Sequence, residues 1–426
     1  MSRERLSVLS VGDLPTTHST GGTGRVALGL CTELARRGHS VTALAPWTPG
    51  AELIGEVNCA TGHLKIKRFG NGLLKQLVGR QAMATFGACL TIRDLLARGA
   101  VSVVLSHHPN TSIGAFWAMN TLNRQIPLVY MFYASHADEI RTGAHQYGRF
   151  SAGLARTLVK PVVQQLVVRL LGRAEAISLR RASRVVTLSL YAKDWAQCLY
   201  QVADDRFTVC PAGVDTQRFC PPQESVSHIR QRLDLPHTSF VLFTLRNLHP
   251  RMGLEVLLQA MPGVLARLPD TLLIIGGQGT LFESLHQMIT DLRLQNHVRL
   301  MGHINELDLP NYYQAADVFV LPTQAMEGFG MVTLEALACG TPVIGTQIGA
   351  TPELLSQLGA EFLFDACDAA ALTAGILRLR EELSKSGDGI RMQCRRLIET
   401  RYTWAASAER LERVLYEVAC PVRQGL

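Results

Sequence analysis

This sequence lacks long apolar runs. No stretch approaches the roughly 20 apolar residues that a membrane-spanning helix needs. The N-terminus, Met1–Arg5, leads directly into the strand-like Leu6–Val11 without a signal-peptide cleavage pattern. The ten cysteines are scattered and include no Cys-x-x-Cys pair, which argues against a disulfide framework and a structural zinc site. These absences predict a cytoplasmic protein.

Two common nucleotide-binding signatures are also absent. No Gly-x-x-x-x-Gly-Lys-Ser/Thr motif occurs, and Gly21–Gly24 lacks the complete Gly-x-Gly-x-x-Gly spacing of a dinucleotide site. A P-loop enzyme and a dehydrogenase are therefore disfavoured. Gly21–Gly24 and Gly276–Gly279 each follow a predicted strand, and each fits either a phosphate-binding loop or a tight turn into a helix.

The composition indicates a folded chain with more than one core. A chain of 426 residues exceeds one ordinary hydrophobic core, and 47% apolar with 18% charged residues is typical of a globular protein. In both halves short apolar stretches alternate with helical ones, the pattern of parallel sheets covered by helices. The predicted strands are Leu6–Val11, Ser40–Ala45, Val101–Leu105, Pro127–Phe132, Arg184–Leu188, Phe207–Cys210, Phe240–Leu245, Thr271–Ile275, His297–Met301, Asp317–Leu321 and Pro342–Gly345.

A domain boundary is predicted near residue 220, where Pro211–Asp215 and Pro221–Pro222 interrupt the pattern. The predicted fold class is α/β, with two Rossmann-like, doubly wound parallel-sheet domains at 1–219 and 220–401. We expect the amphipathic tail within 402–426 to be a helix that packs back on the first domain. Ligands bind at the carboxyl ends of parallel strands, so the expected site is a cleft between the domains.

Two glutamates frame the entry to a predicted helix in the second half. Glu327 lies in a glycine-rich loop after the Asp317–Leu321 strand, and Glu335 lies about two turns further on. Gly328 and Gly330 expose backbone donors at the positive end of the helix dipole, which suits a phosphorylated, hydroxyl-rich ligand. The glutamates could serve as an acid–base pair or as acceptors for sugar hydroxyls, and a helix N-terminus favours the second role.

Two arginines follow the Phe240–Leu245 strand. Arg246 ends the strand and Arg251 begins the next helix. Guanidinium groups at a strand end could clamp a diphosphate, because the planar fork matches phosphate oxygens. The alternative is a pair of ordinary surface charges.

Polar residues also end two strands of the first half. His107 and His108 follow one strand, and Tyr133–Glu139 follows the next. These positions could face the cleft, although histidines at such loops are often ordinary polar residues. Metal binding by His107 and His108 is disfavoured, because adjacent residues rarely direct both rings to one ion.

Basic charge is concentrated in the first half. Residues 1–220 contain 25 Lys+Arg against 13 Asp+Glu, whereas the remainder contains 17 against 22. The segment Arg149–Arg184 interleaves arginines with leucines and valines, which is typical of a basic amphipathic helix on an anionic membrane. The basic residues of His63–Arg80 could extend this surface. The alternative is a helix packed on the sheet with a basic solvent face.

The sequence resembles a known family over nearly its whole length. The motifs that carry the resemblance are Glu327–Gly330 with Glu335, Ala338–Ile344, Gly349–Glu353, Pro211–Asp215 with Phe219, Gly21–Gly22 with Gly38–Val41, and Val186–Ser189. They resemble the retaining nucleotide-sugar glycosyltransferases of the GT-B fold, specifically glycosyltransferase family four.

The resemblance implies a role for each site residue. Glu335 would bind the ribose hydroxyls of the donor, Glu327 the donor sugar, and Arg246 the diphosphate. The implied catalytic residues are Glu327, Arg246 and Tyr133. The implied donor-binding residues are Gly22, Arg246, Arg251, Gly279, Ile304, Gly328, Phe329, Gly330, Met331, Val332 and Glu335. The implied acceptor-binding residues are His107, His108, Ser135 and Glu139.

Two positions depart from the family pattern. The family has an arginine, a lysine five residues later and a glycine directly after that lysine. Counting forward from Arg246 places Arg251 at the lysine position, and counting back from Gly253 places Met252 there. The lysine is absent in both cases, and Arg251 could supply its charge. Tyr133 stands where the family often has a catalytic histidine. Both departures bear on the rate and on the handling of the donor sugar.

The sequence therefore predicts a retaining glycosyltransferase that uses a nucleoside diphosphate sugar. UDP is the first expectation for the nucleotide and GDP the second, with an unknown acceptor hydroxyl. We expect no metal, cofactor or nucleic acid. We do expect a peripheral contact with the inner face of an anionic membrane. The alternatives are a nucleotide-sugar hydrolase or epimerase and a non-catalytic binding module.

Overall fold

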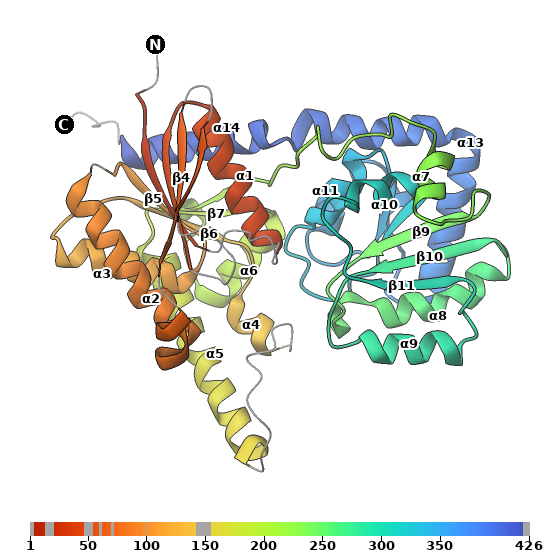
Figure 1. The fold of residues 1–426 in the computed structure, drawn as a ribbon, viewed down its shortest axis with the longest axis horizontal. Coiled ribbons are helices and arrows are strands. Elements are labelled where there is room, and N and C mark those ends of the chain that lie inside the picture. Colours follow the sequence, from red (N-terminus) through yellow and green to blue (C-terminus); the bar gives the residue numbers. More distant parts are fainter. Residues whose placement is uncertain are drawn as a thin grey trace. The chain divides into compact units, whose positions relative to one another are not determined.

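The structure is a computed structural model that describes residues 4–12, 21–46, 54–58, 62–69, 72–99, 101–141 and 155–420, with the backbone alone at 54, 57, 58, 72–84 and 155–164. The chain forms two compact units (Figure 1). Residues 1–212 with 404–426 form the first, and residues 213–403 form the second. The division falls a few residues before the expected boundary at 220. The predicted α/β fold with two parallel-sheet domains is confirmed.

Within the described part of the first unit, the sheet has eight strands in the order β3-β4-β2-β1-β5-β6-β7-β8. In this order the strands are Ile54–Asn58, His63–Phe69, Ser40–Pro46, Ser7–Val11, Val103–Ser106, Leu128–Phe132, Arg184–Thr187 and Phe207–Val209. All pairs are parallel except β3 with β4. The carboxyl ends of β5 and β6, where polar residues were expected, are therefore neighbours.

Strands β3 and β4 were not predicted. In β4, apolar and basic residues alternate, so it resembles a solvated basic segment more than a buried strand. β3 pairs with it in antiparallel register, and Glu56 Oε1 accepts a hydrogen bond from Lys65 Nζ at 2.7 Å. The basic residues of β4 therefore belong to the outer part of the sheet. Lys75 and Arg80 lie where only the backbone is described.

The helices of the first unit follow the predicted alternation. They are α1 (Gly22–Arg36), α2 (Gly72–Arg98), α3 (Pro109–Thr121), α4 (His136–Arg141), α5 (Ala155–Arg181), α6 (Leu190–Tyr200) and the short η1 (Asp204–Arg206). The sequence pattern predicts a helix near 82–98, and α2 begins ten residues earlier, at Gly72. Leu9, Val104 and Tyr130 from neighbouring strands are at most 1% exposed and form the centre of the core.

The last helix completes the first unit. In α14 (Trp404–Ala419), Leu411, Val414 and Leu415 are buried. The Trp404 ring lies against Gly29 of α1, where an added Cβ would lie 2.4 Å from the ring. Glu412 accepts hydrogen bonds from Arg37 Nη2 at 2.7 Å and from His39 Nε2 at 2.8 Å. These contacts hold α14 on α1 and the turn after it.

The second unit has a five-stranded parallel sheet in the order β11-β10-β9-β12-β13. In this order the strands are Val298–Gly302, Thr271–Gly276, Phe240–Leu245, Val318–Leu321 and Val343–Gly345. Its helices are α7 (Val226–Arg232), η2 (Pro250–Met252), α8 (Leu254–Leu265), α9 (Phe282–Asp291), α10 (Leu309–Ala315), α11 (Met331–Ala338), α12 (Thr351–Leu355), η3 (Ala360–Phe362) and α13 (Ala369–Arg401). All five strands were predicted. The long helix α13, which was not, is kinked at Ser386.

Candidate active site

Glu327 lies between β12 and α11 and forms a buried ion pair with Arg246, which follows β9. Arg246 Nη2 donates to Glu327 Oε2 at 2.5 Å and to Thr323 Oγ1 at 2.9 Å. Thr323 in turn donates to Glu327 Oε2 at 3.1 Å. The Arg246 side chain is only 6% exposed and the Glu327 side chain 11%. Because β9 and β12 are neighbours in the sheet, these two strand-end residues meet although they are far apart in the sequence.

Two buried donors beside this pair have no protein acceptor. Arg246 Nε and Thr333 Oγ1 make no hydrogen bond within the part of the chain that the structure describes. A Cβ added at Gly330 would lie 3.0 Å from Thr333 Oγ1 and 3.9 Å from Glu327 Oε1, so these groups surround the same glycine. An unsatisfied buried donor costs about 1–3 kcal/mol. A ligand oxygen at this position would remove that cost.

Glycines shape the loop that carries Glu327. Gly330 caps α11 in a left-handed conformation, with φ of 91°, and provides no side-chain capping bond. The first amides of α11, at Met331 and Val332, have no intrahelical acceptor by helix geometry. Gly349 has φ of 63°, and an added Cβ there would lie 2.3 Å from the Glu327 carbonyl oxygen. That oxygen also accepts a hydrogen bond from Ala350 N at 2.9 Å, which fixes the loop.

The other predicted residues of this loop lie beside it. Gly328 is half-buried, whereas Phe329 is buried with its ring centroid 6.4 Å from that of Tyr402. Met331 and Val332 are half-buried in the first turn of α11. The loop is thus buried at Phe329 and Gly330 and half-buried at Gly328, Met331 and Val332.

Glu335 is buried within α11 and 1% exposed. Its Oε2 accepts a hydrogen bond from the Tyr313 hydroxyl at 2.9 Å. Tyr313 belongs to α10, and its own carbonyl accepts from Thr341 Oγ1 at 2.7 Å. A buried carboxylate is costly unless it is hydrogen-bonded, and Tyr313 supplies such a bond. The carboxylate is held in one orientation, as a hydroxyl-binding group requires.

Arg251 and Met252 occupy the region where the family has its lysine. Arg251 Nη1 donates to the Met326 carbonyl at 3.0 Å and so holds the backbone just before Glu327. Met252 is buried, and its Sδ lies 2.9 Å from Arg246 Nη2. The position directly before Gly253 therefore places a neutral sulfur beside the guanidinium of Arg246, where a lysine would add a positive charge.

Gly279 and Ile304 lie near the ends of β10 and β11. A Cβ added at Gly279 would lie 2.3 Å from the Leu248 carbonyl oxygen, so the turn has no room for a side chain. Ile304 is 8% exposed, and its Cδ1 would lie 2.5 Å from a Cβ added at Gly276. The structure brings both residues to the same sheet edge as Arg246, because β9, β10 and β11 are consecutive.

His107 and Tyr133 of the first unit are bound to each other. His107 Nδ1 lies 2.6 Å from the Tyr133 hydroxyl, and His107 Nε2 lies 3.0 Å from Ser10 Oγ. Burial lowers the pKa of His107 to about 3 and raises the pKa of Tyr133 well above its ordinary value. The imidazole is therefore neutral near pH 7. Its hydrogen bonds link β1, β5 and the residue after β6.

The loop after β6 is held by a carboxylate that sequence reasoning missed. Glu175 of α5 is fully buried and accepts hydrogen bonds from His136 N at 2.7 Å and Ser135 Oγ at 3.3 Å. The Tyr200 hydroxyl also donates to it, and burial followed by the nearby carboxylate raises the pKa of Tyr200. The available signal was a single acid among arginines and leucines in α5.

The remaining predicted residues of the first unit have different degrees of exposure. Ser135 is fully buried, and its hydroxyl also accepts from Asp138 N at 3.2 Å, at the start of α4. His108 caps α3 by accepting from Asn110 N at 3.2 Å, and its ring lies 4.6 Å from that of His136. Glu139 is half-buried in α4. Gly22, at the start of α1, is exposed.

The described half of α5 exposes apolar and basic side chains together. Leu166 is 55%, Leu170 53% and Ile177 42% exposed. Exposed arginines lie between and beyond them, at Arg169, Arg173, Arg180 and Arg181. Arg149 lies outside the described residues, and Arg156 and Lys160 lie where only the backbone is described. Figure 1 shows the early turns of α5 extending away from the sheet of its unit.

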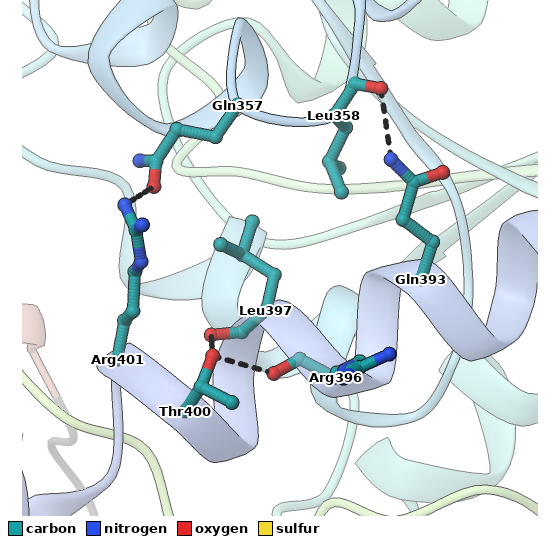
Figure 2. A pocket seen from close by; sticks show the side chains of 7 residues that line it. All are labelled: Gln357, Leu358, Gln393, Arg396, Leu397, Thr400 and Arg401. Atoms are coloured by element: carbon teal, nitrogen blue, oxygen red, sulfur yellow. Dashed lines mark hydrogen bonds between the residues drawn. The ribbon is translucent and has the colours of Figure 1, made fainter.

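A separate shallow pocket lies between the residues after α12 and the last turns of α13 (Figure 2). It has a volume of about 390 Å³. Arg401 Nη1 donates to Gln357 Oε1 at 2.7 Å, and Gln393 Nε2 donates to the Leu358 carbonyl at 3.1 Å. None of its lining residues belongs to the predicted site.

Across the residues that the structure describes, no cluster of three or more His, Cys, Asp or Glu side chains is arranged to hold a metal ion. Within the same ranges, none of the helices has the length and apolar character required to cross a bilayer.

Comparisons with known proteins cover both units. Residues 20–218 match the description "Glycosyltransferase Family 4", and residues 225–413 match "Glycosyl transferases group 1". The structure is similar to sucrose-phosphate synthase from Thermosynechococcus elongatus, with a TM-score of 0.74 and 18% identity over 96% of this chain and 98% of that one.

Two curated relatives carry named activities. The chain is 36% identical over 172 residues to the GDP-mannose-dependent alpha-(1-6)-phosphatidylinositol monomannoside mannosyltransferase of Mycolicibacterium smegmatis. The matched segment covers 39% of this chain and 45% of the relative. The match therefore spans less than half the length of that relative. The chain is 27% identical over 409 residues to the phosphatidyl-myo-inositol mannosyltransferase of Mycobacterium tuberculosis, covering 94% of both.

The two family matches, the two parallel-sheet units and the buried Arg246–Glu327 pair agree with one another. The chain belongs to glycosyltransferase family four and is a retaining glycosyltransferase of the GT-B fold.

Proposed function

We propose that this glycosyltransferase moves mannose from GDP-mannose to a lipid acceptor of the phosphatidylinositol type. The observation that carries the donor site is the Arg246–Glu327 pair, with buried donors beside it that lack a protein acceptor. The named activities of the two relatives support mannose, GDP and an inositol lipid. The sequence alone had placed UDP before GDP, and the relative's name reverses that order.

The second unit would hold the donor through three kinds of group. Glu335, oriented by Tyr313, would accept the ribose hydroxyls. The amides at the start of α11 and the Arg246 guanidinium would bind the diphosphate, since both present positive charge. Glu327 would accept hydroxyls of the transferred sugar. The turn at Gly279 and the backbone near Ile304 would contact the base.

The chemistry would follow from the position of Arg246 between carboxylate and diphosphate. As the bond between the anomeric carbon and the diphosphate breaks, negative charge grows on the leaving oxygen, and a preorganised cation stabilises it. The acceptor hydroxyl would form the new bond on the same face and pass its proton to the departing diphosphate. The residues thus supply charge and orientation, and we propose that the reaction requires no divalent metal.

The first unit would supply the acceptor side. Among the predicted acceptor residues, His108 and Glu139 are not fully buried, whereas Ser135 is bound to Glu175. Ser135 and Glu175 would therefore position the loop, with His108 and Glu139 nearer to the acceptor. Tyr133, held by His107, would fix the backbone after β6.

The exposed face of α5 would contact the membrane that holds a lipid acceptor. Leucine and isoleucine side chains on this face can enter the interface, and arginines attract anionic headgroups at about 1 kcal/mol per basic residue. This mixed face supports the membrane alternative over a purely solvated basic helix.

A transfer assay tests the proposal. GDP-mannose, UDP-glucose and other nucleotide sugars are each supplied with phosphatidylinositol vesicles, with a chelator, and the lipid products are analysed. We expect a mannosyl lipid from GDP-mannose alone. Release of free sugar without a lipid product would indicate a hydrolase, and tight donor binding without turnover would indicate a binding module.

A matched pair of variants tests the membrane face. Arg169→Gln with Arg173→Gln should weaken binding to anionic vesicles at low salt, because each loses one headgroup contact. Arg293→Gln with Arg396→Gln removes the same charge from the second unit and should leave vesicle binding unchanged. Equal binding by both double variants would contradict the assignment of α5.

A further inference from the structure

The second unit contains another cavity, at the opposite edge of the sheet from Arg246 and Glu327. It has a volume of about 460 Å³ and lies where the strands begin. Phe240 is the first residue of β9, Asp270 directly precedes β10, and Asp317 directly precedes β12. The kinked part of α13, at Gly387 and Asp388, closes its other side.

Four arginines line this cavity, and one of them is fully committed to the fold. Arg230 donates to the carbonyls of Ala315, His237 and Ser239 at 3.0–3.1 Å and to Asp317 Oδ2 at 2.8 Å. Arg230 and Asp317 therefore neutralise each other as a structural pair.

The other three arginines are poorly satisfied. Arg391 reaches Asp317 only at 3.6 Å and two carbonyls only at 3.5 Å, and burial lowers the pKa of its guanidinium. Arg380 lies over the Phe240 ring at 5.2 Å, and its Nε is buried without a hydrogen bond in the described structure. Among the described residues, the Arg267 side chain has no hydrogen-bond or ion-pair partner. Guanidinium donors with long or missing hydrogen bonds at one cavity match the oxygens of a phosphate group.

The three carboxylates at the cavity offset this charge only in part, with Asp317 and Asp388 both close enough to Arg391 to favour its charged form. Asp317 is already shared by Arg230 and Arg391 and also accepts from Val241 N at 2.8 Å. Asp270 and Asp388 are exposed and form no ion pair with the three arginines among the described residues. The lining also includes the residues Thr238 and Ser239, which carry hydroxyl groups. A ligand with one phosphate and several hydroxyls would satisfy both sets.

We propose that this cavity binds the phosphate group of a small molecule through Arg267, Arg380 and Arg391. The site is distinct from the donor site, since its residues lie at the amino ends of the strands whose carboxyl ends carry Arg246 and Thr323. It does not depend on the transferase proposal. Bound phosphate would tie the kink of α13 to the strand starts and so stabilise the second unit.

Thermal unfolding of the full chain with inorganic phosphate and with mannose 6-phosphate, at constant ionic strength, tests this site. Arg246→Gln is used as background, because it removes the only guanidinium that we assign to the diphosphate at the donor site and so weakens anion binding there. We expect both probes to raise the melting temperature in that background. Arg267→Gln with Arg380→Gln should raise the half-saturating concentration at least tenfold. Arg293→Gln with Arg396→Gln, which removes the same charge elsewhere in the unit, should not.

The outcomes separate the possibilities. A lower half-saturating concentration for mannose 6-phosphate than for inorganic phosphate would identify a phosphorylated metabolite as the ligand. Equal half-saturating concentrations would identify free phosphate. Both results would support the site. Loss of the effect in Arg246→Gln alone, or an undiminished effect in the Arg267–Arg380 double variant, would overturn the proposal. If the double variant does not fold, the single variant Arg267→Gln, at an exposed position, gives the same comparison with a smaller expected shift.

Discussion

Replacing Glu327 with glutamine separates the structural from the catalytic use of the Arg246–Glu327 pair. The pair joins Nη2 and Oε2 at 2.5 Å, and the two side chains are only 6% and 11% exposed. Removing one partner of a buried pair typically costs about 3–5 kcal/mol because the other charge remains buried. Glutamine keeps the shape and one acceptor oxygen for Arg246, so the loss should be smaller, about 1–3 kcal/mol.

The same substitution should not weaken binding of the nucleotide alone. In the wild-type chain the diphosphate must share Arg246 with Glu327, whereas in Glu327→Gln the guanidinium has lost its charged partner. A diphosphate that binds this arginine therefore stabilises the variant at least as much as the wild type. At 100 times its Kd, a ligand adds about 2.7 kcal/mol, a shift that thermal unfolding resolves easily.

Turnover should fall much more than stability. A charged hydrogen bond to the transferred sugar contributes about 1.5–3 kcal/mol. The variant loses this hydrogen bond and also the negative charge beside the reacting carbon, so we expect kcat to decrease about 100-fold or more. The assay measures kcat and nucleotide affinity on the same folded preparation. Arg293→Gln, far from this loop in sequence, is the control. Turnover within threefold of wild type, or loss of nucleotide binding, would refute this account of Glu327.

Three further predictions concern other parts of the molecule. Glu335→Gln should weaken nucleotide binding at least tenfold while changing kcat less, which calorimetry with the nucleotide measures. Gly349→Ala should destabilise the chain by about 2–4 kcal/mol and reduce transfer, because its Cβ would lie 2.3 Å from the Glu327 carbonyl oxygen and its φ is 63°; an unchanged melting temperature would contradict this. Burial lowers the pKa of His107 to about 3, whereas an unfolded histidine has a pKa of about 6.5, so on acidification the unfolded chain takes up this proton before the folded chain does. The free energy of unfolding should therefore fall as the pH drops below about 6.5, by up to about 1.4 kcal/mol per pH unit, and should level off near pH 3. His107→Asn should flatten that part of the stability profile, and an identical profile would show that other groups cause it.

The glycine-rich loop that carries Glu327 could be predicted as a candidate site because the residues that mark it are close together in the sequence. Glycines, a helix start and two glutamates stand within a few residues, and the rule that ligands bind at strand carboxyl ends added Arg246. The contact between Arg246 and Glu327 was less visible, because β9 and β12 are neighbours in space but not in sequence. Strand order is set by packing of the whole sheet, which no short pattern encodes.

Other features depended on partners that no local pattern reveals. Arg251 was expected at the diphosphate, which stays a prediction, and no sequence pattern indicated that its Nη1 donates to the carbonyl of Met326. In the sequence, Glu175 is a single acid within a basic helix. Its role in holding the loop after β6 becomes apparent only when α5 is seen to lie against that loop. β4 was missed because its alternating lysines are also typical of solvated segments.

The membership of α14 in the first unit has a consequence for synthesis. Residues 213–403 enter and leave their unit at one place, where Val214 pairs with Thr403 and Val214 N donates to the Tyr402 carbonyl at 2.9 Å. During translation the whole second unit emerges before Trp404 can cover Gly29 and before Glu412 can reach His39. The unit that begins first is therefore completed last. Until then the face of α1 that α14 covers stays open to water and to other nascent chains.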